Sequence, residues 1–255
     1  MNPSNRVLAI LQLFENGQPV WTVEEIAREL GASTSTTYRH VRELVQSGFL
    51  DPVSGAGYAL GPAFIRYDRI LRQNDELIRI ATPIMENLLA QTSQKATVIL
   101  CRRFKDCVMC VFEVHGNEPH LSTSYERGVA MPMFLGATSK VILSNLPDRA
   151  LKSVYLGNEQ TIHQLLHVDT WQQFKDEIRS IKRAGYAITD SEVAEGRIGL
   201  AAPISRDQQV VAGISLVAVP STTERKKVAG YVTHVVEAAK KISIELSKEA
   251  SIVPR

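Results

Sequence analysis

Apolar residues near the start of the chain recur every three or four positions, which predicts short amphipathic helices. The first of these helices can be capped by Ser4 and carries apolar residues at positions 7, 10, 11 and 14. Two more helices are expected between Val23 and Leu50, separated at Gly31, where the chain needs a positive φ to leave a helix. The second of this pair begins after the capping residue Ser33 and keeps only a narrow apolar stripe. This spacing is typical of a helix-turn-helix.

The outer face of that second helix is polar from Ser33 to Arg42. Hydroxyl groups and a helix N-terminus suit phosphates, and arginine can donate two hydrogen bonds to guanine O6 and N7 in a major groove. A plain helical hairpin has similar spacing, so the interpretation depends on the segments that follow. The candidate DNA-contacting residues are Ser33, Thr34, Ser35, Thr36, Tyr38, Arg39, Arg42 and Tyr58, the last of which also suits packing beneath the hairpin described next.

Two short strand-like segments, Phe49–Asp51 and Tyr58–Leu60, flank a turn that contains two glycines. They predict a β-hairpin, which makes residues 1–61 a winged helix-turn-helix domain composed mainly of α-helix. Pro62 then begins an amphipathic helix, which we expect to connect two domains over residues 62–75. The second domain is expected to span residues 76–255.

The pattern in the second domain changes from helix to strands and back to helix. Several apolar strands in sequence, with helices before and after them, predict an antiparallel sheet flanked by helices and therefore an α+β fold class. The expected elements are a helix from Pro83 to about Thr92 capped by Thr82, strands at 96–103, 107–113, 120–125, 198–204 and 209–219, and a final helix from Ser221, in a capping box with Glu224, to about Glu249.

Three segments together carry a resemblance to a known family: GYALGPAFIRYDRIL after the wing, PMFLGATSKVIL, and DSEVAEGRIGLAAPI. With the helix-turn-helix, they make the chain similar to the IclR family of bacterial transcription regulators from about Asn5 to about Leu246. The resemblance implies a GAF-like effector-binding domain after the winged domain. It also implies a homodimer or tetramer that binds double-stranded operator DNA and, more often than not, represses a catabolic operon.

We expect a small-molecule site where the apolar segment Pro132–Lys140 enters a helix, because free backbone N–H groups there favour a carboxylate. A helix start packed closely on a strand is the alternative interpretation. By resemblance, the second wall of the site comes from the loop and strand at 189–201. The candidate effector-binding residues are Met133, Leu135, Ala137, Thr138, Ser139, Thr189, Asp190, Ile198, Gly199 and Ser215.

Of four pocket positions compared with the family pattern, three depart from it and one matches it. Gly199 stands where many members have cysteine, Thr189 where an aspartate is frequent, and Val217 where a serine is common, whereas Ser215 matches a polar pocket position. These departures predict a less polar and roomier pocket. The expected effector is a small organic acid that is bulkier than a short keto acid, such as an aromatic or branched one.

Three carboxylates crowd one segment, at Asp190, Glu192 and Glu195. No nucleophile or partner base lies near them in the sequence, so we expect a polar loop that closes the pocket and no catalytic residue. The alternatives are an enzyme with an appended winged domain and a non-catalytic interaction module. Salt separates them from a DNA reader, whose affinity falls steeply as salt rises.

The formal net charge of +2 excludes a general polyanion binder, so DNA affinity depends on a local arrangement of cations. Every cation before Lys95 is an arginine, which suits bidentate contacts to phosphate or guanine. The chain shows no signal peptide or membrane-spanning run, and three cysteines fit a reducing compartment, so we expect a cytoplasmic protein that contacts no membrane.

Two patterns resemble metal sites, but neither predicts a metal or another cofactor. Cys107 and Cys110 are three residues apart on an expected strand, so they point to opposite faces, and small buried side chains are the better interpretation. His163 and His167 stand four apart near Asp169, but no glutamate follows the first histidine as in a zinc protease helix.

Overall fold

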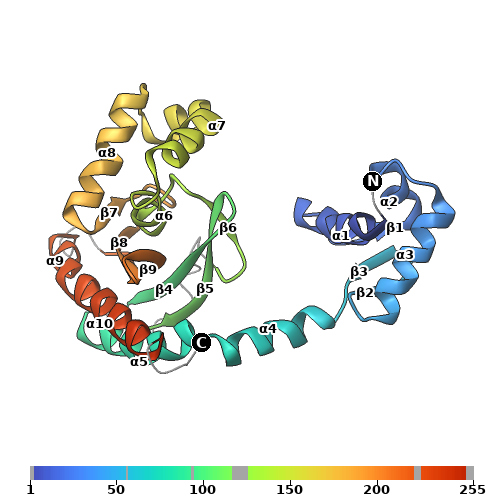
Figure 1. Ribbon diagram of the computed structural model, residues 1–255, viewed down its shortest axis with the longest axis horizontal. Coiled ribbons are helices and arrows are strands. Elements are labelled where there is room, and N and C mark those ends of the chain that lie inside the picture. The colour runs from blue at the N-terminus through green and yellow to red at the C-terminus, as the bar shows by residue number, and fades with distance from the viewer. Residues whose placement is uncertain (1–2, 56, 93–94, 117–125, 221–224, 251–255) are drawn as a thin grey trace. The chain divides into compact units, whose positions relative to one another are not determined.

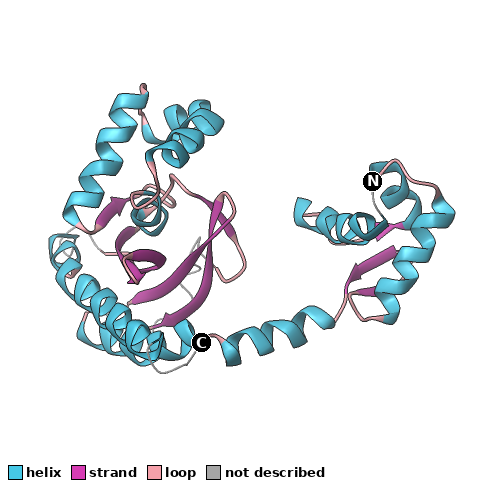
Figure 2. Ribbon diagram, viewed as in Figure 1, coloured by secondary structure: helices cyan, strands magenta, loops and turns pink. Residues whose placement is uncertain are grey.

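The structure, a computed structural model, describes residues 3–55, 57–92, 95–116, 126–220 and 225–250. It divides into two compact units, Met1–Asp75 and Glu76–Arg255 (Figure 1). The first is mainly helical and the second is built on an antiparallel sheet with helices on both faces (Figure 2). The predicted α+β fold class is confirmed. No helix within the described ranges is long and apolar enough to cross a membrane.

The first unit is a winged helix-turn-helix whose three short strands form a sheet in the order β1-β3-β2. Tyr58 of β3 pairs with Trp21 on one side and with Pro52 on the other. Strand β1 was not predicted, because two residues are too short to show an alternating pattern. The elements are α1 (Pro3–Leu13), the 3₁₀ helix η1 (Phe14–Asn16), β1 (Trp21–Thr22), α2 (Val23–Glu29), α3 (Thr34–Gln46), β2 (Leu50–Val53), β3 (Gly57–Leu60) and α4 (Ala63–Asn74).

Local sequence signals fix the turn between α2 and α3. Thr22 and Glu25 form a capping box at the start of α2, each side chain satisfying a backbone N–H of the other residue. At the other end Gly31 has φ +58°, the left-handed conformation that the sequence predicts there. The Ala32 amide donates to the Ala27 carbonyl at 2.9 Å, which closes the turn. The second helix therefore leaves the first at a defined angle.

Gly61 joins the wing to α4 by a close backbone approach. A Cβ atom at this position would lie 2.3 Å from the carbonyl oxygen of Gly48. The Gly61 amide donates to the Phe49 carbonyl at 2.8 Å, and the Ala63 amide donates to the Gly48 carbonyl at 2.9 Å. Only glycine allows these hydrogen bonds to form together.

The second unit contains a six-stranded antiparallel sheet in the order β6-β5-β4-β9-β8-β7. The central strands β4, β8 and β9 are buried over more than half of their length, which explains their long apolar runs. The elements are α5 (Glu76–Gln91), β4 (Ala96–Phe104), β5 (Cys107–His115), β6 (Ala130–Pro132), α6 (Ala137–Leu143), α7 (Asp148–Leu166), α8 (Trp171–Ala184), β7 (Ala187–Asp190), β8 (Ile198–Arg206), β9 (Gln209–Ala218), α9 (Arg225–Gly230) and α10 (Val232–Ala250).

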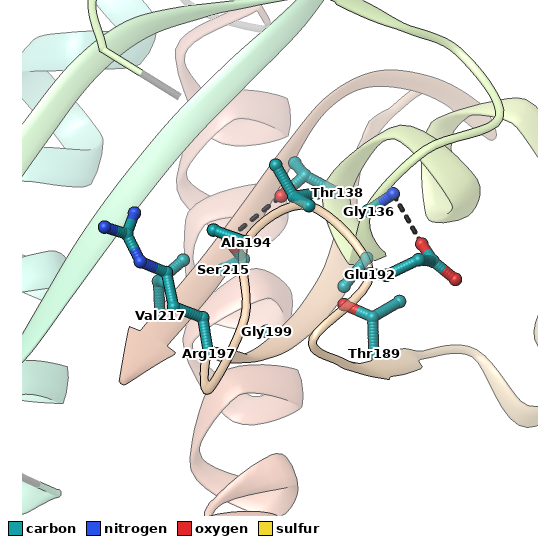
Figure 3. A pocket seen from close by; sticks show the side chains of 11 residues that line it. Gly136, Thr138, Thr189, Glu192, Ala194, Arg197, Gly199, Ser215 and Val217 are labelled. Atoms are coloured by element: carbon teal, nitrogen blue, oxygen red, sulfur yellow. Dashed lines mark hydrogen bonds between the residues drawn. The ribbon is translucent and has the colours of Figure 1, made fainter. Parts of the chain in front are cut away.

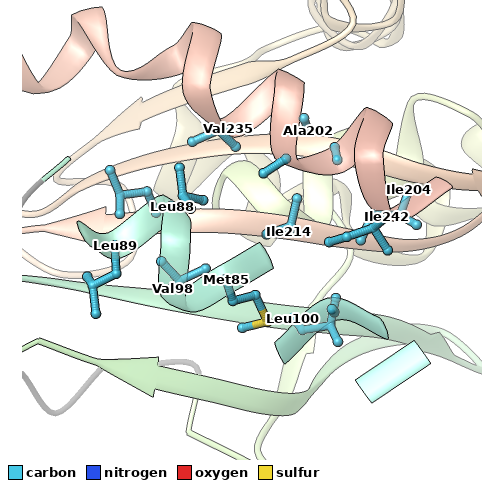
Figure 4. Packing of buried hydrophobic residues seen from close by; sticks show 14 of the residues in the cluster. Met85, Leu88, Leu89, Val98, Leu100, Ala202, Ile204, Ile214, Val235 and Ile242 are labelled. Carbon is cyan, nitrogen blue, oxygen red and sulfur yellow. The ribbon is translucent and has the colours of Figure 1, made fainter. Parts of the chain in front are cut away.

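Each face of this sheet packs against its own helices. Helices α5 and α10 cover one face and form what we call the α5/α10 core, which includes Met85, Ile214 and Ile242 (Figure 4). Helix α6 packs on the other face, and helices α7 and α8 join it in a second cluster, the α7/α8 core, around Phe134 and Phe174. Because strand side chains alternate between the faces, neighbouring residues of one strand belong to different cores.

Two predictions for this unit are corrected, and two others concern residues that the structure does not describe. The helix expected from Pro83 begins at Glu76, because the buried stripe continues through the proline and the Thr82 hydroxyl donates to the Ile78 carbonyl at 2.7 Å instead of capping a helix. The single final helix is two helices, α9 and α10, which separate at Tyr231. The expected strand at 120–125 and the capping box at 221–224 lie outside the described residues.

Candidate functional site

Helix α3 presents most of the predicted DNA-contacting residues to solvent. Ser33 caps it by accepting a hydrogen bond from the Thr36 amide at 3.4 Å, and its hydroxyl donates to the Thr36 hydroxyl at 3.0 Å. Thr36 is therefore half-buried and engaged in the cap. The side chains of Ser33, Thr34, Ser35, Tyr38, Arg39 and Arg42 are exposed.

The opposite face of α3 anchors it in the first unit. Val41 and Leu44 are buried as predicted, and Thr37 and His40 are buried beside them, which the polar character of both residues concealed. Tyr58 is half-buried and packs against the same core, so the structure gives it the packing position that was the alternative to DNA contact. The exposed polar face is held rigidly because the buried face is continuous.

The second unit contains a small, partly open pocket between α6, strand β9 and residues 191–197, a segment that we call the pocket loop (Figure 3). Its volume is about 30 Å³, enough for about one water molecule. The lining mixes apolar side chains with hydroxyl and charged groups. The lining residues are Gly136, Ala137, Thr138, Thr189, Glu192, Val193, Ala194, Arg197, Gly199, Ser215 and Val217.

Hydroxyl groups and a glycine shape the floor of the pocket. The buried Thr138 hydroxyl donates to the Ser215 hydroxyl at 2.9 Å. A Cβ atom on Gly199 would lie 3.0 Å from the Thr189 hydroxyl oxygen and 3.4 Å from the Ala137 Cβ. The prediction of a roomier pocket is therefore corrected, because Thr189 takes up the space that a glycine leaves at position 199.

Glu192 occupies the place where a ligand carboxylate was expected. It accepts a hydrogen bond from the amide of Gly136 at 2.7 Å, one residue before Ala137, Thr138 and Ser139, whose N–H groups were predicted to bind that carboxylate (Figure 3). Glu192 also pairs with the Lys140 ammonium, which donates to Glu177 of α8 at 2.7 Å. The side chain of Lys140 is only 5% exposed, and this one buried cation contacts two carboxylates.

The structure brings together five of the predicted effector-binding residues: Ala137, Thr138, Thr189, Gly199 and Ser215 line the pocket. The other five lie elsewhere.

Met133 belongs to the α7/α8 core and Leu135 packs against it, while Ser139 is wholly buried within α6. Ile198 faces the α5/α10 core because it alternates with Gly199 on β8. Asp190 points away to an ion pair with Arg225 of α9.

Sequence reasoning left six lining residues out of the site. Glu192 was predicted to lie in a loop over the pocket, and Val217 was identified as a departure from the family pattern. Neither was predicted to bind the effector. Gly136, Val193 and Ala194 carry no chemical signal of their own. Arg197 does, since it is the single cation of the pocket loop. Among the described residues, no hydrogen bond or ion pair engages its guanidinium, which lies beside Val217 (Figure 3).

The metal-like patterns resolve into packing and surface contacts. Cys101 and Cys110 lie opposite each other on β4 and β5 in the α7/α8 core, and burial holds the pKa of the Cys101 thiol well above its usual value. His163 lies 3.2 Å from Asp169 on an exposed surface. Within the part of the chain that the structure describes, no group of three or more histidine, cysteine, aspartate or glutamate residues could hold a metal ion.

A winged helix-turn-helix with an exposed hydroxyl-and-arginine face, followed by a sheet domain with a small pocket, defines the class of DNA-binding regulators that carry their own ligand domain. Residues 71–244 match the family described as the bacterial transcriptional regulator IclR C-terminal domain, and residues 5–54 match the IclR helix-turn-helix domain. The chain belongs to the IclR family. It is a transcription regulator with a DNA-binding domain and a ligand-binding domain, and it is not an enzyme.

Relatives are similar over most of their length. The chain is 26% identical over 211 residues to the HTH-type transcriptional regulator KipR of Bacillus subtilis (strain 168), covering 82% of each protein. It is 23% identical over 244 residues to the transcriptional repressor IclR of Escherichia coli (strain K12), covering 94% of this chain and 88% of that one. An IclR homolog from Microbacterium hydrocarbonoxydans, solved in complex with 4-hydroxybenzoate, shares the fold with a TM-score of 0.76 at 20% identity, over 97% of this chain and all of that one (100%).

Proposed function

We propose that this protein is a repressor of a catabolic operon and that a small organic acid, bound in the pocket, changes its affinity for operator DNA. The observation that carries the DNA half is the exposed face of α3, where Arg39 and Arg42 stand beside the hydroxyls of the first turn. We place the protein in the cytoplasm, where its proposed target lies. The repressor role is supported by the names of two relatives, a transcriptional repressor and an acetate operon repressor.

Each α3 helix would enter a major groove, and two copies would bind a pseudo-palindrome with half-sites about one helical turn apart. Apolar side chains on α4 support self-association, since Ile65 is 76% exposed and Leu71 is 64% exposed in the single chain. Phe64 and Tyr67 of the same helix pack on Phe49 and so tie α4 to the winged unit. A homodimer or tetramer joined in part through α4 would carry a change between two arrangements of the DNA-binding pair.

The charge of the pocket favours an acid as the effector. Arg197 lines it without a partner among the described residues, and the Lys140 ammonium lies directly behind Glu192. Val193, Ala194 and Val217 supply apolar surface for the rest of the ligand. The 4-hydroxybenzoate of the Microbacterium homolog supports an aromatic acid in kind. Such a ligand exceeds a volume of about 30 Å³, so binding requires a wall of the pocket to move.

A mobility-shift titration tests both halves of the proposal. The purified protein is titrated against its own upstream region at two salt concentrations, with and without a panel of aromatic and aliphatic carboxylic acids. We expect binding that resists competitor DNA, weakens steeply with salt and changes with one class of acid. Absence of a specific shift under all conditions would point to an interaction module instead of a repressor.

A further inference from the structure

The pocket loop is the wall that can move, because it is irregular backbone between two strands. Ser191 adopts φ +57°, its amide donates to the Arg197 carbonyl at 2.7 Å, and its hydroxyl accepts from the Gly196 amide at 3.1 Å. These contacts close the loop on itself. The other walls belong to α6 and β9, whose residues are built into the cores of the second unit.

Glu192 is the residue that holds this closed loop against the body of the domain. Its carboxylate binds the Gly136 amide and the Lys140 ammonium, both outside the loop. The Glu192 side chain is 16% exposed and that of Lys140 is 5% exposed, so the pair is shielded from water. Removing one partner from a buried ion pair leaves an uncompensated charge, which is strongly unfavourable.

The pocket is too small to hold an organic ligand unless part of it moves. About 30 Å³ is available, whereas pockets for small organic ligands measure roughly 300–1,000 Å³. Binding therefore requires Glu192 to leave Lys140 and the loop to lift. A neutral ligand would leave the buried ammonium with only Glu177 as its counter-charge, but an acid would replace the departing carboxylate with another.

We propose that Glu192 is an internal stand-in for the effector: its carboxylate holds the pocket loop shut on Lys140, and the carboxylate of an incoming acid takes its place and releases the loop. This inference rests on the proposed effector pocket. Lys140 keeps two carboxylates throughout the exchange, so the charge around the buried ammonium is the same in both states. The exchange selects acids over neutral molecules of the same shape, such as an amide.

The contact of Glu192 with Lys140 and Gly136, which we call the latch, also lowers the apparent affinity for the acid, because only the fraction of molecules with an open loop binds it. Weakening the latch raises that fraction. Glu192→Gln keeps the size of the side chain and removes its charge, so it should tighten acid binding, the opposite of what loss of a ligand-contacting residue does. Glu177→Gln is the matched control, since Glu177 binds the same ammonium but does not line the pocket.

Two measurements on the full-length protein test the latch. The first is amide hydrogen exchange at Gly136, whose N–H donates to Glu192. We expect exchange at this position to be about three- to tenfold faster in Glu192→Gln and faster still in Glu192→Ala, and unchanged in Glu177→Gln. Circular dichroism verifies that each variant is folded. Unchanged exchange in both Glu192 variants would overturn the latch.

The second measurement is calorimetric titration with benzoate, pyruvate and benzamide. We expect at least one of the two acids to bind about three- to tenfold more tightly to Glu192→Gln than to the wild type, with no gain in Glu177→Gln and no binding of benzamide to the wild type. Weaker acid binding to Glu192→Gln would make Glu192 a ligand contact and overturn the proposal. If no acid binds any variant, the proposed effector pocket fails, and the exchange rates still decide whether Glu192 holds the loop.

Discussion

The recognition helix α3 and the proposed effector pocket differ in whether their polar groups have partners within the protein. Arg39 and Arg42 face solvent, and within the described residues neither forms an ion pair. In the pocket, Glu192 forms an ion pair with Lys140, and Thr138 donates a hydrogen bond to Ser215. One surface leaves its polar groups available, while the other satisfies them internally.

The difference follows from burial. Water solvates an exposed guanidinium, so an arginine without a protein partner does not destabilise the fold before DNA binds. A buried hydroxyl or ammonium without a partner costs free energy, so the protein must supply partners until a ligand arrives. A DNA-binding surface can therefore be predicted from its side chains alone. To predict a ligand pocket, the contacts that those side chains already make within the protein must also be known.

The largest effect expected is on the open surface. Replacing Arg39 and Arg42 together by alanine should weaken operator binding by roughly 2–4 kcal/mol, since each good bidentate contact contributes about 1–3 kcal/mol. Fluorescence anisotropy with operator and random duplexes measures the loss. Arg39→Lys separates the roles of the single residue: a base contact loses sequence preference, whereas a phosphate contact weakens all duplexes alike. An Arg183→Ala control in α8 should leave binding unchanged.

The rigidity of the support beneath that surface is tested at Gly61. Gly61→Ala brings a Cβ to 2.3 Å from the Gly48 carbonyl oxygen, and we expect the free energy of unfolding to fall by about 1–3 kcal/mol, as for other overpacked sites. Urea denaturation of the full chain measures it. Gly157→Ala, where a Cβ meets no atom within 4 Å, is the control. Equal stability of Gly61→Ala and wild type would mean that the wing does not need this close approach.

Internal satisfaction of the pocket is tested at Thr138. Thr138→Val removes the donor to Ser215 and leaves that buried hydroxyl without it, which should cost about 1–2 kcal/mol of stability. Adding Ser215→Ala removes the stranded partner, so the double variant should lose less than the sum of the two single ones. Additive losses in a double-mutant cycle would show that the two hydroxyls do not depend on each other.

The smallest effect concerns Asp190, which the sequence placed in the pocket and the structure places outside it. Hydrogen bonds from Arg225 and then from Ser191 hold the pKa of Asp190 below its ordinary value. A carboxylate whose pKa is lower in the folded state stabilises the fold above its unfolded pKa of about 3.9 and loses that effect as pH falls through the folded value.

Asp190→Asn should therefore lower the melting temperature at neutral pH and flatten its decline in acid. The side chains of the pair are 49% and 32% exposed, so solvent screening keeps the effect below about 1 kcal/mol. Melting curves between about pH 3 and pH 7 measure it, with Asp207→Asn as an exposed control. A loss of acid binding in Asp190→Asn would return this residue to the pocket.

Residue patterns predicted the winged unit more fully than the sheet domain. The capping serine, the glycine at the turn and the narrow stripe of α3 are local signals that act within one or two helical turns. The start of α5 was missed because a proline normally ends a helix, and here burial of Ile80 and Ala81 maintains the helix through it. Packing overrode the local preference.

By itself the sequence determined the family, the polar face of α3 and half of the residues that line the pocket, because each depends on residue type at short spacing. Only the tertiary structure decided that Glu192 fills the carboxylate position, that Thr189 fills the space beside Gly199, and that Ile198 faces the other core. The physical reason is that these contacts depend on how separate segments pack together, as for Gly136 at the start of α6 and Glu192, which lie 56 positions apart in the chain. Residue type determines which interactions a side chain can form, and the fold determines which of those interactions are already formed within the protein.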